Sequence, residues 1–119
     1  MARKQKLTIW HKPNCSKSIA AMKFLREHEI TPDTVFLYLE TPPGEDEIRD
    51  VLKKLNIPAE QLVRKKEPVY SEKFAGKKMT EEKWIKALVK YPVLIQRPIL
   101  IKGNKAVFGR SEEELNSII

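Results

Sequence analysis

The chain has 119 residues, of which 41% are hydrophobic and 33% are charged. This length suits one domain with one core, and the composition is typical of a folded soluble protein rather than a disordered one. No apolar run approaches the ~20 residues that a membrane helix needs, and no secretory leader is apparent. We therefore expect a cytoplasmic protein.

The formal net charge of +7 raises the question of nucleic-acid binding. However, the 23 basic residues alternate with 16 acidic ones, and the longest basic runs are short, around Arg3 and Lys4 and at residues 64–66. No recognition motif accompanies them. The pattern favours a solvated basic surface first, attraction of a small anion second and nucleic acid last.

The first part of the chain predicts a β-α-β unit. Leu7–Trp10 is a short β run, and residues 35–39 are apolar at every position, which predicts a central strand covered on both faces. Residues 16–28 between them predict a helix, and a crossover of this kind makes the two strands parallel. The apolar face of that helix comprises Ala20, Ala21, Met22, Phe24 and Leu25.

The middle of the chain is predicted to be helical, forming an insert at about residues 44–91. One amphipathic helix is indicated by the spacing of Ile48, Val51, Leu52 and Leu55, and shorter helices are expected at residues 59–63 and around 70–74. Thr80 is expected to cap a further helix. The side chains which that helix would bury are Trp84, Ile85, Leu88 and Val89.

The last part predicts a hairpin followed by a short helix. Gly103–Asn104 joins two β runs in "PILIKGNKAVFG", and Ser111 with Glu114 forms a capping box. The expected structure is a single α/β domain over residues 1–119, with a four-stranded mixed sheet and flanking helices. The order β-α-β, helical insert, β-β-α is that of the thioredoxin-like fold.

The only cysteine, Cys15, follows the first predicted strand and opens the first predicted helix. The unpaired N–H groups and the dipole of a helix start stabilise a thiolate. Lowering the thiol pKa from ~8.5 to ~6.5 takes about 2.7 kcal/mol, more than a helix end alone supplies. Neighbouring groups are therefore needed, and the candidates are His11, Ser16, Lys17 and Ser18.

The alternative for Cys15 is a small buried hydrophobic residue, the usual role of a lone cysteine. Its polar, turn-forming neighbours, Pro, Asn, Ser and Lys, favour an exposed thiol instead. A single cysteine forms no disulfide within the chain, which fits a reducing compartment. Any redox chemistry must then take its second thiol from another molecule.

Five blocks resemble, in order and spacing, the glutaredoxin-linked arsenate reductase family. They are "HKPNCSKS", "FLYLETPP", "LVRKKEPVY", "YPVLIQRPIL" and "FGRSEEEL", and the likeness runs from about Leu7 to Ile118. The resemblance implies a thioredoxin-like fold with a helical insert. It also implies reduction of arsenate to arsenite, with glutathione as co-substrate, glutaredoxin as partner and no bound cofactor.

The resemblance also implies roles for individual residues. Cys15 matches the catalytic cysteine of the family, and His11 matches the histidine before it. The three anion-binding arginines match Arg64, Arg97 and Arg110, and the peptide bond between Arg97 and Pro98 is expected to be cis. Each arginine has a surface role as its alternative. That alternative is weakest for Arg97, which stands between two apolar runs.

The implied chemistry suits these residue types. Arginine keeps its charge and binds two oxygens of an oxyanion at once, so that a thiolate can attack arsenate and form a covalent adduct on Cys15. Glutathione and then glutaredoxin would complete the reaction. With two histidines, one cysteine and no ligand-like spacing, no metal site is expected.

Ile19 departs from the family pattern, because many relatives carry arginine four residues after the cysteine. This departure is either a tolerated substitution or one that bears on the identity of the substrate, more than on the fold or the nucleophile. Two alternatives of other classes also stay open. One is a glutathione-dependent thiol oxidoreductase without arsenate activity. The other is a non-enzymatic regulator like the stress-response proteins of the same superfamily that bind RNA polymerase. Ser18 stands where a C-x-x-C redox switch would need its second cysteine, which argues against such a switch. Substrate preference, the choice of glutaredoxin and the oligomeric state stay open.

Overall fold

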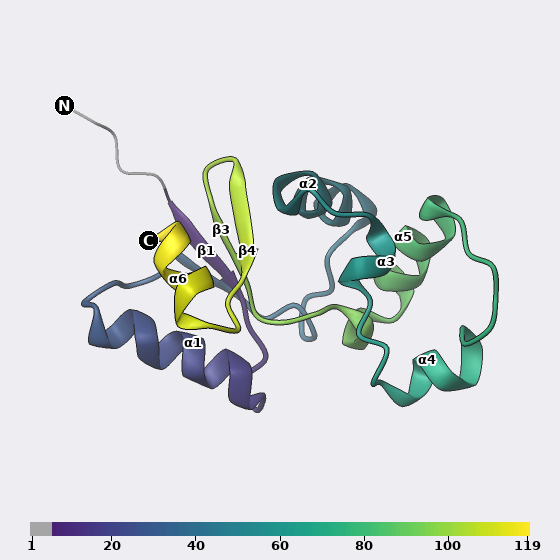
Figure 1. Ribbon diagram of the computed structural model, residues 1–119, viewed down its shortest axis with the longest axis horizontal. Coiled ribbons are helices and arrows are strands. Elements are labelled where there is room, and N and C mark those ends of the chain that lie inside the picture. The colour runs from purple at the N-terminus through teal and green to yellow at the C-terminus, as the bar shows by residue number, and fades with distance from the viewer. Residues whose placement is uncertain (1–5) are drawn as a thin grey trace. The chain divides into compact units, whose positions relative to one another are not determined.

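The structure, a computed structural model, describes residues 6–119 (Figure 1). These residues form two compact units. The first comprises the chain up to Thr41 together with Arg97–Ile119, and the second comprises Pro42–Gln96. Arg3 and Lys4 of the first basic run lie outside the described residues. Within the described part, no helix is long and apolar enough to cross a membrane.

The first unit contains a four-stranded mixed sheet, as the sequence predicts. The strands are β1 (Leu7–Trp10), β2 (Thr34–Phe36), β3 (Ile99–Lys102) and β4 (Lys105–Phe108), and they lie in the order β2-β1-β3-β4. β1 is parallel to β2 and antiparallel to β3, which pairs antiparallel with β4. The expected hairpin is confirmed, because Gly103 and Asn104 join β3 directly to β4.

The apolar run at residues 35–39 does not form the central strand that its composition predicts. β2 lies at the edge of the sheet and ends at Phe36. Val35 in this strand is 41% exposed, and Leu39 beyond it is 38% exposed. Two aromatic residues of this run pack against Trp10 of β1 instead. The rings of Phe36 and Tyr38 lie 5.2 Å and 6.4 Å from that of Trp10. The central strands are β1 and β3.

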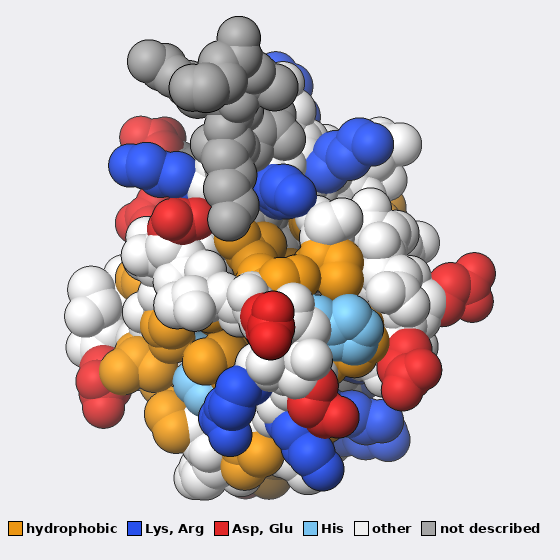
Figure 2. All heavy atoms as spheres, turned by 90° about the vertical axis from the view of Figure 1, so that its left-hand side faces the viewer, with side chains coloured by type: hydrophobic (Ala, Val, Ile, Leu, Met, Phe, Trp, Pro, Cys, Tyr) orange, Lys and Arg blue, Asp and Glu red, His pale blue; other side chains and the backbone are white. Residues whose placement is uncertain are grey.

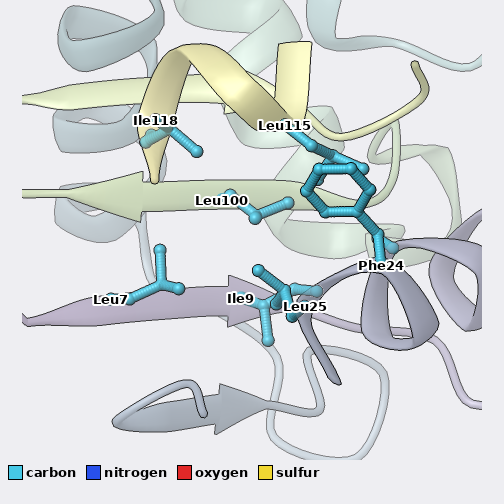
Figure 3. Packing of buried hydrophobic residues seen from close by; sticks show 8 residues of the cluster. Leu7, Ile9, Phe24, Leu25, Leu100, Leu115 and Ile118 are labelled. Carbon is cyan, nitrogen blue, oxygen red and sulfur yellow. The ribbon is translucent and has the colours of Figure 1, made fainter. Parts of the chain in front are cut away.

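Two helices of the first unit, α1 (Ser16–Glu27) and α6 (Glu112–Ile118), pack on one face of the sheet (Figure 1). Ala20, expected in this interface, is exposed, whereas Ser18 is buried. The predicted cap of α6 is confirmed, since Ser111 Oγ accepts a hydrogen bond from the N–H of Glu114. Figure 3 shows seven labelled side chains of this core: Leu7, Ile9, Phe24, Leu25, Leu100, Leu115 and Ile118.

The second unit is helical, as predicted. It contains α2 (Glu45–Leu55), α3 (Ala59–Leu62), α4 (Pro68–Lys73), α5 (Glu81–Lys90) and a short 3₁₀ helix, η1 (Pro92–Leu94). Thr80 caps α5, because its hydroxyl oxygen accepts a hydrogen bond from the N–H of Lys83 at 3.2 Å. A carboxylate of α5, Glu81, accepts from the N–H of Ala59 and thereby ties α5 to α3.

Candidate active site

Cys15 lies where the chain turns from β1 into α1. Its N–H donates to the carbonyl of Lys12 at 3.0 Å, and its own carbonyl accepts from the N–H of Ile19 at 2.9 Å. The buried hydroxyl of Ser18 accepts from the N–H of Lys12 at 3.3 Å, which closes the turn from inside. The thiol is thus fixed at the N-cap of α1 and stays partly exposed.

Burial by itself would raise the pKa of the Cys15 thiol, but hydrogen bonds lower it further than burial raises it. The thiolate is stabilised by the backbone N–H of Ser18, by the side chain of Arg97 and by the backbone N–H of Lys17, and the charge of Arg97 adds to their effect. The pKa falls from 9.0 to about 7. About half of the molecules therefore carry a thiolate at pH 7, against about 1% for an unperturbed thiol.

Arg97 reaches the thiol because of strand pairing. Trp10, the last residue of β1, lies opposite Ile99 of β3, so the residues just before Ile99 lie at the end of β1 from which the Cys15 turn departs. The side chain of Arg97 is only 4% exposed. A guanidinium held at this depth needs an anionic partner, and the Cys15 thiolate is one.

The backbone after Arg97 is held in place by Gly109. The bond between Arg97 and Pro98 is cis, the isomer that the resemblance implies. The N–H of Gly109 donates to the carbonyl of Pro98 at 3.0 Å. A Cβ on Gly109 would lie 2.5 Å from Leu100 Cδ1 and 3.3 Å from Pro98 Cγ. A side chain here would force Leu100 to shift, so glycine at this position supports the loop that carries Arg97.

Arg110 lies at the same end of the sheet. Phe108, the last residue of β4, is opposite Ile99, and the guanidinium carbon of Arg110 lies 4.7 Å above the ring of Phe108. Arg110 is exposed. It lines a cavity of about 220 Å³ together with Lys17, two residues beyond the thiol. The anion-binding role that the resemblance implies for Arg110 stays a prediction.

His11 lies at the start of the turn and is half-buried. Its backbone N–H donates to the carbonyl of Phe36 at 2.9 Å, and burial lowers the pKa of its imidazole below the usual 6.5. Nδ1 is buried and has no hydrogen-bond partner within residues 6–119. The ring is therefore neutral at pH 7, and His11 supplies no positive charge to the thiolate.

Ser16 begins α1 and is exposed. The backbone groups that lower the thiol pKa belong to Lys17 and Ser18. Sequence reasoning selected these residues for a side-chain ammonium and a side-chain hydroxyl, whereas the structure uses their main-chain N–H groups. The position of Cys15 at a helix start is the signal for such amides.

Arg64 belongs to the second unit. Its N–H donates to the carbonyl of Leu94 at 2.6 Å, next to an isolated β-bridge between Val63 and Ile95. Its Nε is buried and finds no hydrogen-bond partner in the described part of the chain. The anion-binding role that the resemblance implies for Arg64 stays a prediction.

Gly109 is the supporting residue that sequence reasoning missed. A single glycine between a strand and a helix cap is ordinary, and only the distances from its missing Cβ reveal the role.

Over residues 6–119, no group of three or more His, Cys, Asp or Glu side chains is placed to hold a metal ion.

The site combines a thiol at a helix start with a buried arginine beside it. A second arginine, Arg110, lies at the same end of the sheet. Residues 10–118 match the ArsC family. The chain belongs to the ArsC family. The arsenate reductase of Neisseria meningitidis serogroup A is 33% identical over 95% of this chain and 97% of its own length.

Two further comparisons support membership of the ArsC family. Uncharacterized protein YfgD of Escherichia coli (strain K12) is 39% identical over 97% of this chain and 98% of its own length. The solved structure of an arsenate reductase from Vibrio cholerae superposes with a TM-score of 0.90 at 30% identity, covering 98% of this chain and 100% of that one. The expected thioredoxin-like α/β fold is confirmed.

Proposed function

We propose that this protein is an arsenate reductase that uses glutathione and glutaredoxin as external reductants. The observation that carries the proposal is the contact between Cys15 and Arg97, which combines a thiol of pKa about 7 with a buried guanidinium at the same place. The names of the relatives support arsenate as substrate. The presence of a single cysteine supports an external reductant.

In the first step the Cys15 thiolate attacks the arsenic atom of arsenate. A sulfur–arsenic bond forms, and one arsenate oxygen leaves as water after taking up a proton. Arg97 and Arg110 offset the negative charge of the oxyanion, which would otherwise repel the thiolate. Arsenic stays in its +5 state in this step.

In the second step the thiol of glutathione attacks the sulfur of Cys15. The sulfur–arsenic bond breaks, its electron pair stays with arsenic, and arsenite leaves in the +3 state. The two sulfur atoms are oxidised to a mixed disulfide. A glutaredoxin thiolate then attacks the glutathione sulfur and restores the Cys15 thiolate. We place this reaction in the cytoplasm, where glutathione keeps thiols reduced.

A coupled assay tests the proposal by following NADPH oxidation with glutathione, glutaredoxin and glutathione reductase. We expect arsenate-dependent turnover for the wild type, none for Cys15→Ser and a raised KM for arsenate with Arg97→Ala. Arg26→Ala, which changes an exposed arginine of α1, serves as the matched control. Wild-type protein that shows no turnover with arsenate contradicts the proposal.

Two further arms of the assay separate the alternatives. Replacement of glutathione and glutaredoxin by thioredoxin and its reductase should abolish turnover if the reductant is assigned correctly. A glutathionylated peptide without arsenate tests the thiol oxidoreductase alternative. The observation that favours this alternative is Ile19, which lies one turn after Cys15, is 51% exposed and replaces the cation of many relatives.

A further inference from the structure

Five lysines surround one shallow cavity of about 400 Å³ on the second unit. Its apolar lining, which we call the floor, comprises Phe74, Met79, Ala87 and Tyr91. We call this surface the lysine pocket, and its cations are Lys73, Lys77, Lys83, Lys86 and Lys90. All of these residues lie within Pro42–Gln96, so the pocket shares no residue with the site around Cys15.

The pocket results from helix periodicity in α5 and from the segment before it. Lys83, Lys86 and Lys90 have the spacing of one helix face, while Trp84 and Leu88 of α5 are buried. Lys73 and Lys77 come from the end of α4 and the turn after it. Helix α4 is anchored to α5 by aromatic packing, because the ring of Phe74 lies 5.7 Å from that of Trp84.

The positive charge of the pocket is only partly offset by nearby carboxylates, since Glu82 interacts with Lys86 through space. The two acidic residues of α5 make their direct contacts outside the pocket: Glu81 accepts from the N–H of Ala59, and Glu82 pairs with Arg49. Among residues 6–119, none of the five ammonium groups forms an ion pair. On the side of the molecule that Figure 2 shows, by contrast, side chains of both signs are interspersed.

The floor of the pocket is apolar, and the Tyr91 ring in it already has close neighbours. The ammonium groups of Lys73 and Lys90 lie 5.9 Å and 5.6 Å from the centre of the Tyr91 ring, and Phe74 meets the same ring edge-on at 5.8 Å. A nucleic-acid base that stacked on this ring would compete with the two ammonium groups. The pocket also contains no arginine, the residue suited to bidentate phosphate binding. These features disfavour a nucleic acid.

A small molecule is also disfavoured. Small-molecule sites enclose their ligand and direct a few fixed polar groups at it. The lysine pocket is open, and its polar groups are flexible ammonium ions at the rim. Long lysine side chains around an apolar floor suit a macromolecular partner, since their charges steer the encounter while the floor receives one apolar side chain.

We propose that the lysine pocket binds an acidic segment of a partner protein, in which carboxylates surround a central apolar side chain. The carboxylates pair with the five lysines, and the apolar side chain covers Phe74, Met79 and Tyr91. Contacts of this kind give fast, salt-sensitive association.

Amide chemical shifts of ¹⁵N-labelled protein test this proposal directly. The probe is a short blocked peptide in which Asp and Glu residues flank a central Leu–Phe pair. We expect shift changes confined to residues 73–91, and a Kd that rises roughly tenfold when the salt concentration is raised from low to above physiological levels. The same peptide with Asn and Gln in place of Asp and Glu should not bind.

A pair of variants with equal change in net charge locates the site. Lys83→Glu with Lys90→Glu should raise the Kd for the peptide roughly tenfold or more, whereas Lys23→Glu with Lys53→Glu, on α1 and α2, should change it by less than about twofold. If the first pair disturbs the spectrum of the free protein, Lys83→Gln with Lys90→Gln replaces it, with a smaller loss in the same direction.

Several outcomes overturn the proposal. They are shift changes spread over the whole surface, equal losses for both pairs of variants, or equal binding of the uncharged peptide. Tighter binding of polyuridylate than of the acidic peptide would assign the pocket to nucleic acid instead. Arsenate turnover plays no part in these measurements, so failure of the proposed enzymatic function leaves this test unaffected.

Discussion

The side chain of Arg97 hydrogen-bonds the sulfur of Cys15, although 81 intervening residues separate them in the sequence. The contact depends on the pairing of β1 with β3, which places both residues at one end of the sheet. The buried guanidinium and the thiol form a charged pair once the thiol ionises.

Replacement of Arg97 by alanine should raise the pKa of Cys15, because both the hydrogen bond and the charge that lower it are lost. At pH 7 the rate of alkylation by iodoacetamide should fall about tenfold, following the thiolate fraction. Arg97→Lys keeps the positive charge but loses the planar guanidinium. Its alkylation rate should lie between those of the wild type and Arg97→Ala. The measurement is the alkylation rate from pH 5 to 10, and an unchanged midpoint in Arg97→Ala would show that the guanidinium does not act on the sulfur.

The stability of the protein should depend on pH through Cys15. The folded pKa of about 7 is lower than the 9.0 of an unperturbed thiol, so the ionised form favours the folded state. This contribution is complete above pH 9, decreases as the pH falls and disappears below pH 7. After solvent screening of a partly exposed group, we expect about 1 kcal/mol.

Urea unfolding of wild type and Cys15→Ser under reducing conditions measures that contribution. The difference between their free energies of unfolding should grow from pH 6 to pH 9.5. A constant difference over that range would contradict a folded-state thiolate.

His11→Ala should leave the pKa of Cys15 nearly unchanged. The imidazole is neutral at pH 7 because burial lowers its pKa, and a neutral ring cannot attract a thiolate as a cation does. The alkylation midpoint should therefore move by less than about 0.3 pH units, a small effect beside that of Arg97→Ala. A shift of a whole unit would restore His11 to the thiolate-supporting role that the sequence suggests.

Ser18→Ala should destabilise the turn that holds Cys15. The buried hydroxyl accepts a hydrogen bond from the N–H of Lys12, and alanine would leave that N–H unsatisfied, at a cost of about 1–3 kcal/mol. Ser16→Ala is the matched control, since Ser16 is exposed in the same helical turn. Equal unfolding free energies for the two variants would exclude a structural role for the Ser18 hydroxyl.

Gly109→Ala should lower the free energy of unfolding by about 1–3 kcal/mol through overpacking. The added Cβ meets Leu100 at 2.5 Å and Leu115 at 3.0 Å, both in the core. Gly44→Ser also adds a side chain, but at an N-cap where the nearest atom to a Cβ is 3.9 Å away. It should be neutral or slightly stabilising. Denaturant unfolding compares the two, and similar stability of both variants contradicts the steric argument.

Local signals predicted the local structure well. The Gly103–Asn104 turn and the caps at Thr80 and Ser111 depend on neighbouring residues only, and all three are present. The edge position of β2 could not be predicted from local signals. The apolar residues at 35–39 suggest burial, but they do not show which strand or helix packs against them. β1 takes its second partner, β3, from beyond the whole helical unit.

The candidate site, too, could be predicted from the sequence only in part. The position of Cys15 at a helix start and the apolar neighbours of Arg97 pointed to a reactive thiol and a constrained arginine. The neutral state of His11 and the packing of Gly109 depend on side chains brought together by the fold. The lysine pocket depends on two helices, so the sequence showed only scattered lysines.

The order of Cys15 and Arg97 along the chain affects when the thiol becomes reactive. Cys15 is synthesised early, whereas Arg97 and β3 follow the entire second unit. A nascent or truncated polypeptide that stops before residue 97 carries this sulfur without its guanidinium or its adjoining strand. We therefore expect such an incomplete chain to be alkylated more slowly at neutral pH than the finished molecule.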